Sequence, residues 1–147
     1  MRALIFIALS TLVVSCSGSD RPSRAAGTAG STESAQGSAE DDAAVLGREV
    51  YDLVDRAMSY RSSHRGRLPR SLRELGIDEL TPTTSRTLTV AGTVPTVSVG
   101  FRSGANHTLV SCRGTGTLLE EASLSGGEFS LICDLVSGGT TTLKAQR

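Results

Sequence analysis

The feature that most constrains the fold of this chain is an amphipathic segment within residues 41–77. Apolar residues recur there at the i, i+3, i+4, i+7 spacing of one helix face, and charged residues occupy most of the other face. We therefore predict one helix over about residues 43–65, with Asp41 or Asp42 as its N-cap and Gly66 just beyond its end. The predicted buried stripe consists of Leu46, Val50, Leu53, Ala57 and Tyr60, widened by Val54 and Met58.

The second half of the chain is a series of short segments with strand character, separated by glycine-rich turns. Apolar and polar residues alternate over residues 86–91, 96–101, 107–113, 128–136 and 140–145, which is the period of a strand with one buried face. Residues 117–124 fit either a strand or a helical turn. Successive strands joined by tight turns form an antiparallel meander. Together with the long helix, and a short second helix at residues 70–75, this pattern predicts an α+β domain.

The first 15 residues predict a targeting segment that is not part of the fold. Arg2 precedes a nearly continuous apolar run that ends at residue 14, and this run is too short to span a bilayer, which takes about 20 residues. The run ends in Val13-Val14-Ser15-Cys16, which resembles the lipobox of bacterial lipoproteins. That resemblance implies removal of residues 1–15 as a signal peptide and attachment of diacylglycerol, with palmitate-type acyl chains, to Cys16. The alternative is an ordinary secretory signal that happens to contain a cysteine.

A lipid on Cys16 would determine the location of the protein. Two or three acyl chains hold a protein firmly on a membrane without a transmembrane helix, so we expect a lipid-anchored protein of the cell envelope. In the enterobacterial sorting pattern an aspartate after the cysteine retains lipoproteins in the inner membrane, and Ser17 therefore favours the outer membrane. Residues 16–42 are then the lipidated cysteine and a disordered linker of Ser, Gly and Ala. Residues 43–147 are one globular domain.

The segment HRGRLPRSLRELGI at residues 64–77 resembles the phrase that follows the helix in type IV pilins and type II secretion pseudopilins. The resemblance implies a pilin-like fold, in which one long helix packs on an antiparallel meander. The chain departs from that family at its beginning, where a lipobox and a polar linker replace the prepilin leader and the hydrophobic half of the helix. The residues at matching places are Gly66, Leu68, Pro69, Ser71, Leu72, Leu75 and Gly76.

Cys112 and Cys133 are the two cysteines left over from the lipobox. Both lie in strand-like segments of a chain that we expect to be exported to an oxidising compartment, and paired late cysteines are also common in pilins. We predict a disulfide between neighbouring strands, with Cys133 on the core face together with Phe129. By simple alternation, Val110 and not Leu109 should share the face of Cys112. Two buried free thiols or a metal pair are the alternatives.

No motif in the sequence indicates catalysis or a cofactor. There is no Gly-x-Ser-x-Gly elbow, no phosphate-binding loop and no Asp-rich calcium loop. His107 lies five residues before Cys112, but together with Cys133 these residues lack a fourth ligand and the usual zinc spacing. We therefore expect neither a metal site nor an enzyme.

The charges of the chain are balanced, with 15 basic and 15 acidic residues, so we expect no nucleic-acid partner. One basic cluster lies at the C-terminal end of the predicted helix and just beyond it. It is either a patch for an acidic partner or lipid head groups, or a solvated helix end whose charges complement the helix dipole. The cluster consists of Arg61, Arg65, Arg67, Arg70 and Arg73.

Two functional classes remain. The first is a non-catalytic structural or protein-interaction module in the envelope, with envelope, secretion or pilus proteins as its expected partners. The second is a protein that binds a small ligand or a glycan. A deep apolar pocket with a few convergent polar groups would favour the second class.

Overall fold

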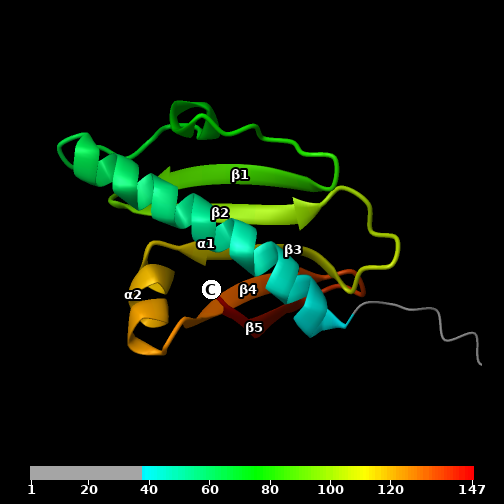
Figure 1. Ribbon diagram of the computed structural model, residues 1–147. Helices are drawn as coiled ribbons and strands as arrows, with labels where there is room; N and C mark the ends of the chain where they lie inside the picture. Colours follow the sequence, from blue (N-terminus) through cyan, green and yellow to red (C-terminus); the bar gives the residue numbers. More distant parts are fainter. Residues whose placement is uncertain (1–37) are drawn as a thin grey trace, which may run out of the picture. The chain divides into compact units, whose positions relative to one another are not determined.

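A long helix packed on a five-stranded antiparallel sheet forms the domain (Figure 1). The computed structural model describes residues 38–147, so the predicted signal peptide, Cys16 and the linker up to residue 37 lie outside the described residues. Helix α1 (Ala39–Ser63) is followed by the 3₁₀ helix η1 (Leu72–Leu75). The strands are β1 (Thr84–Ala91), β2 (Val94–Phe101), β3 (Leu109–Thr115), β4 (Glu128–Leu135) and β5 (Thr140–Gln146), and α2 (Thr117–Leu124) lies between β3 and β4.

The strands pair in chain order, β1-β2-β3-β4-β5, and every neighbouring pair is antiparallel. The predicted α+β class and the antiparallel meander are therefore confirmed. Residues 117–124, for which the sequence left two readings, are helical. The short helix predicted at residues 70–75 is a single 3₁₀ turn, ended by Gly76 in a left-handed conformation with φ of 68°. No helix in the described part of the chain is long and apolar enough to cross a membrane.

Helix α1 begins one turn earlier than predicted. Its N-cap is Ser38, so the prediction that Asp41 or Asp42 has this role was wrong. The Ser38 hydroxyl accepts a hydrogen bond from the Asp41 N–H at 3.1 Å, and the Asp41 carboxylate accepts one from the Ser38 N–H at 3.3 Å. This reciprocal capping box satisfies two donors that the helix itself leaves unpaired. The chain leaves the helix through Arg65 and Gly66, both with positive φ.

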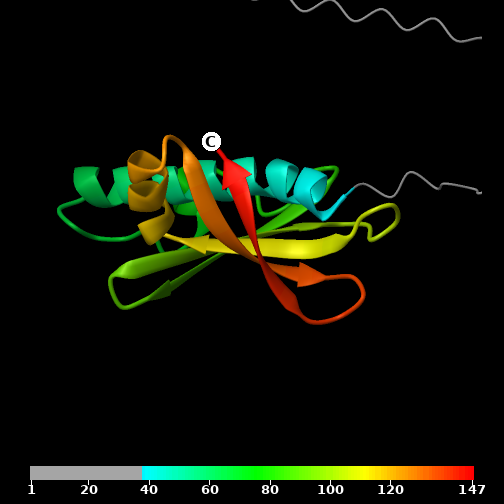
Figure 2. The same ribbon diagram turned by 90° about the horizontal axis from the view of Figure 1, so that it is seen from below.

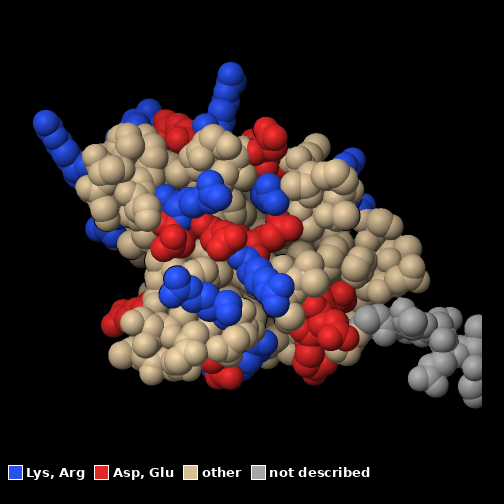
Figure 3. All heavy atoms as spheres, viewed as in Figure 1, with Lys and Arg blue, Asp and Glu red and all other residues tan. Residues whose placement is uncertain are grey.

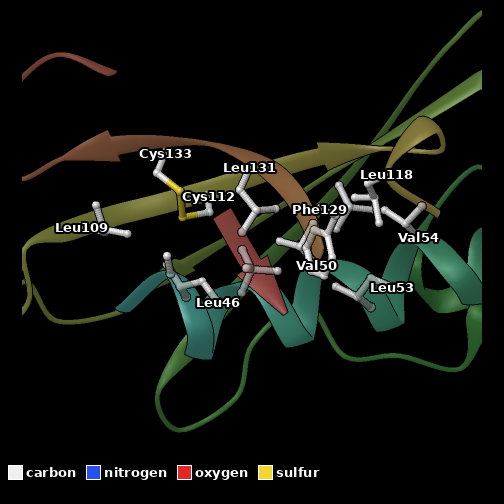
Figure 4. Packing of buried hydrophobic residues seen from close by; sticks show 14 of the residues in the cluster. Leu46, Val50, Leu53, Val54, Leu109, Cys112, Leu118, Phe129, Leu131 and Cys133 are labelled. Carbon is white, nitrogen blue, oxygen red and sulfur yellow. A yellow bond between two sulfur atoms is a disulfide. The ribbon is translucent and has the colours of Figure 1, made fainter. Parts of the chain in front are cut away.

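Most of the predicted stripe of α1 forms the core together with one face of the sheet (Figure 4): Leu46, Val50, Leu53, Val54 and Ala57 are buried, and Met58 packs against them partly buried. Tyr60, also predicted in the stripe, is only partly buried and lies outside the core. Gly47 allows the close approach, because a Cβ there would lie 2.7 Å from the Cβ of Ala145. Figure 2 shows both helices on the same side of the sheet. The largest fully buried side chains include Phe129, Leu46, Leu109, Leu131, Val50, Val54, Val97 and Val99.

Strand β3 contains an irregularity that overturns one prediction. Leu109 pairs with Leu135, but two residues later Ser111 pairs with Asp134, so Val110 is an extra residue in β3. Such a β-bulge shifts the alternation of side chains by one position. Leu109 is therefore buried together with Cys112, whereas Val110 is 47% exposed. The prediction that Val110 shares the face of Cys112 was wrong.

Candidate functional site

A cleft beside the first turns of α1 brings together the most unusual polar contacts of the described residues. It has a volume of about 610 Å³ and lies between α1, the end of β2 and the segment that leads into β3. Its lining combines apolar side chains with polar and charged ones. The lining residues are Asp41, Asp42, Val45, Pro82, Thr83, Thr84, Phe101, Arg102, Ser103 and His107.

Asp42 is the centre of this arrangement. It lies in the first turn of α1, yet it is only 4% exposed. Its carboxylate accepts hydrogen bonds from His107 Nδ1 at 2.8 Å and from the backbone N–H groups of Thr108 at 2.6 Å and Leu109 at 3.1 Å. A buried carboxylate is costly unless it is fully hydrogen-bonded, and these three donors meet that requirement.

The environment of Asp42 keeps its carboxylate ionised. Burial by itself raises the pKa of Asp42, but the hydrogen bond from His107 and those from the two backbone N–H groups outweigh burial, so the pKa lies below its usual value. An ionised carboxylate can only accept hydrogen bonds. His107 Nδ1 is therefore the donor, and the ring presents Nε2 on its other side.

His107 is held in one orientation by two contacts. Its ring stacks on Phe101 with 3.5 Å between the ring centroids, while Nδ1 is bound to Asp42. The side chain remains 31% exposed, and Nε2 has no hydrogen-bond partner within residues 38–147. A histidine oriented in this way accepts a hydrogen bond at Nε2 when neutral and donates one when protonated.

The remaining walls add hydrogen-bonding groups and apolar surface. Arg102 Nη1 donates to the Thr81 carbonyl at 2.9 Å, which leaves the other N–H groups of this guanidinium for further contacts. Val45, one turn after Asp41 in α1, also lines the cleft and is 53% exposed. The arrangement can hold a small molecule with an apolar body and one or two polar groups.

The predicted disulfide is present. Cys112 and Cys133 lie directly opposite each other on β3 and β4, and their sulfur atoms are bonded at 2.04 Å with Cα atoms 4.0 Å apart. Both cysteines are fully buried on the core face together with Phe129, as predicted. The bridge lies in the core and not in the cleft.

The basic cluster is spread over an exposed end of the domain. Arg67 lies over the ring of Tyr60, with its guanidinium carbon 5.4 Å from the ring centroid, donates to the Tyr60 hydroxyl and is 3.8 Å from Glu74. Arg65, Arg70 and Arg73 are exposed, whereas Arg61 is half-buried. Figure 3 shows basic side chains projecting from the side of the molecule where α1 ends. None of the five arginines of the basic cluster lines the cleft that contains Asp42 and His107.

Sequence reasoning did not connect Asp42 with His107. The two residues are 65 positions apart, and an aspartate in a first helical turn already has a simpler explanation as a cap. The only site hypothesis that the sequence offered for His107 was a zinc ligand. No group of three or more potential metal ligands is close enough to hold an ion within the described residues.

No protein-family model matches the sequence, and comparisons with curated proteins and with solved structures find no match.

Proposed function

We propose that this chain is a lipid-anchored cell-envelope lipoprotein that displays a non-catalytic, pilin-like interaction domain. The outer membrane is the favoured location over the inner membrane. The observation that carries this proposal is the lipobox at Cys16, placed at the end of an apolar run that is too short to span a bilayer. The described domain begins 22 residues later, at Ser38. A tether of that length holds a domain at a short distance from the membrane surface.

The layout of the domain supports the pilin-like part of the proposal. One long helix is followed by a short turn, an antiparallel meander and a disulfide in the later strands, which is the order that the resemblance implies. Within residues 38–147 the apolar stripe of α1 is buried on the sheet of its own chain. We therefore propose a tethered module that works beside secretion or pilus proteins without packing into a filament core.

Metabolic labelling with a fatty acid tests the anchor. Wild-type protein should incorporate the label and lose residues 1–15, and Cys16→Ala should do neither, because the thiol that accepts the lipid is missing. Ser17→Ala is the matched control and should be labelled normally. Equal labelling of Cys16→Ala and wild type would reject the proposal.

Cross-linking in intact cells tests the interaction role. The full chain, cross-linked and purified from solubilised membranes, should carry secretion or pilus proteins. Arg65→Glu combined with Arg70→Glu should reduce this yield if the basic cluster is the contact surface, whereas Thr87→Val on the distant β1 strand should not. A wild-type protein that cross-links only to itself would contradict the role.

The cleft at His107 favours a second candidate function, which is the binding of a small ligand. Its support is the imidazole of His107, which is oriented by Asp42 and lines a cleft together with apolar residues. Native mass spectrometry of protein purified from its own envelope should show a retained small molecule. His107→Gln should lose it, and His64→Gln, at the exposed end of α1, should keep it. If both variants retained the small molecule equally, the cleft would be excluded as its binding site.

A further inference from the structure

The face of the sheet turned away from α1 carries a different set of side chains from the core face. Side chains alternate along a strand, so Ser98, between the buried Val97 and Val99, points to this open face. In the described part of the chain no helix lies across it (Figure 2). Strand pairing aligns the outward residues in cross-strand rows, one being Thr87–Ser98–Arg113–Ile132–Thr142 and the next Ser85–Gly100–Ser111–Asp134–Thr140. Hydroxyl groups dominate both rows.

A groove of about 560 Å³ opens on this face where α2 meets the sheet. Its volume is within the range of small-molecule sites, roughly 300–1,000 Å³. Helix α2 lies between β3 and β4 at this end and supplies one wall. We call this feature the hydroxyl groove, and its main lining residues are Thr96, Thr115, Ser130, Ile132, Thr142 and Glu121.

The charged groups around the hydroxyl groove are already paired with each other. Arg113 Nη1 is 3.3 Å from the carboxylate of Asp134. Glu121 accepts hydrogen bonds from the Ser130 hydroxyl at 2.6 Å and from Lys144 Nζ at 2.9 Å, and these two donors lower the pKa of Glu121 to about 2. An ionic ligand would have to displace one of these partners and leave a charge uncompensated. The groove therefore favours an uncharged ligand.

Two hydroxyl groups in the groove are available to such a ligand. The side-chain hydroxyls of Thr96 and Thr142 form no hydrogen bond with another group of residues 38–147, whereas the Thr115 hydroxyl is already hydrogen-bonded to that of Thr117 at 2.7 Å. Each free hydroxyl can both donate and accept. Next to Thr142 on the paired strand, Ile132 exposes 47% of its surface. The groove thus offers hydroxyl groups that can donate and accept hydrogen bonds, one exposed apolar side chain, and charged groups that are already paired.

We propose that the hydroxyl groove binds a neutral glycan. Sugar rings carry hydroxyl groups that donate and accept, together with weakly apolar C–H faces, and they have no net charge. Thr96 and Thr142 would exchange hydrogen bonds with ring hydroxyls, and Ile132 would lie against a C–H face. This inference goes beyond the proposed function and does not depend on the lipid anchor or on the His107 cleft.

Amide resonances of the full chain, recorded in a phosphocholine detergent without sugar head groups, provide the test. The probes are the neutral tetramers of N-acetylglucosamine and of β-1,4-linked glucose, with tetragalacturonate as the anionic control. At least one neutral tetramer should shift the resonances of Thr96, Ile132 and Thr142. Thr96→Val and Thr142→Val should each weaken binding about fivefold, because each loses one hydrogen bond at nearly constant shape.

Matched controls separate binding from folding. Thr87→Val, on the same face but outside the groove, should bind within about twofold of wild type, and Cys16→Ala should bind as wild type does. The proposal is overturned if neither neutral tetramer binds at about 10 mM. It is also overturned if both groove variants bind as wild type does, as expected for hydroxyls that only solvate a strand, or if tetragalacturonate binds as tightly as the neutral tetramers.

Discussion

The two ends of α1 are held in different ways. At the N-terminal end, Asp42 is buried and binds His107, Thr108 and Leu109, all more than 60 residues away in sequence. At the C-terminal end the contacts are local: His64 stacks on Tyr60 with ring centroids 3.7 Å apart, and Arg67 lies over the same ring. These C-terminal groups are largely exposed.

The difference shows that only the N-terminal end of α1 is held by buried polar contacts with distant parts of the chain. Exposed local pairs contribute little to the free energy of unfolding, because solvent screens them and ordering long side chains opposes them. Buried charged hydrogen bonds contribute more, and their loss leaves other groups unpaired. The proposed tether joins the chain at the firmly held end, so a pull on the anchor would act directly on the Asp42 contacts.

Removal of the disulfide should have the largest effect. Cys112→Ala combined with Cys133→Ala should lower the free energy of unfolding by about 3 kcal/mol, because the bridge closes a loop of about 20 residues in the unfolded chain. Leu46 in the N-terminal half of α1 points toward this bridge (Figure 4). Urea unfolding measures the loss, and hydrogen exchange should increase more around Leu46 than around Ala57. A uniform increase along α1 would show that the bridge does not favour one end.

Asp42→Ala should have the next largest effect. It removes the charged acceptor of the hydrogen bonds from His107, Thr108 and Leu109, so we expect a loss of about 2–3 kcal/mol in urea unfolding. Asp55→Ala, an exposed position on the same helix, is the matched control and should change the stability by less than about 0.5 kcal/mol. Equal effects of the two substitutions would mean that the hydrogen bonds of Asp42 contribute no more to stability than an exposed aspartate does.

The same contacts should make stability depend on pH. The folded-state pKa of Asp42 lies below the ordinary value of 3.8, so its ionised form stabilises the fold above about pH 4, and this contribution is lost as pH falls through the lower folded-state value. The difference in unfolding free energy between wild type and Asp42→Asn should therefore shrink below about pH 4. If the difference in unfolding free energy between wild type and Asp42→Asn stayed constant from neutral to strongly acidic pH, the lowered pKa of Asp42 would be contradicted.

The C-terminal end should show the smallest effects. Arg65→Ala and Arg70→Ala should each change the free energy of unfolding by less than about 0.5 kcal/mol. Arg67→Ala should cost slightly more, about 0.5–1 kcal/mol, because it also loses the contact with the Tyr60 ring. Thermal or urea unfolding checks all three. A loss larger than that of Asp42→Ala would reverse the comparison between the two ends.

The sequence by itself determined the elements that depend on local periodicity. The stripe of α1, the alternating strands and the α+β class all follow from patterns a few residues long, because side-chain period and backbone conformation are directly linked. The disulfide was also predictable, since Cys112 and Cys133 are the only cysteines besides Cys16, which was assigned to the predicted lipobox. The exact start of α1 was missed by one turn, although the Ser38 and Asp41 pair carries a capping signal.

Only the tertiary structure decided the register and the sites. The bulge at Val110 depends on how β3 aligns with β4, and no local pattern specifies that alignment. The pairing of Asp42 with His107 and the hydroxyl groove likewise arise where distant segments meet. Local periodicity specifies which face of an element is buried, but it does not specify which residue of another element lies opposite, because that depends on how the whole core packs.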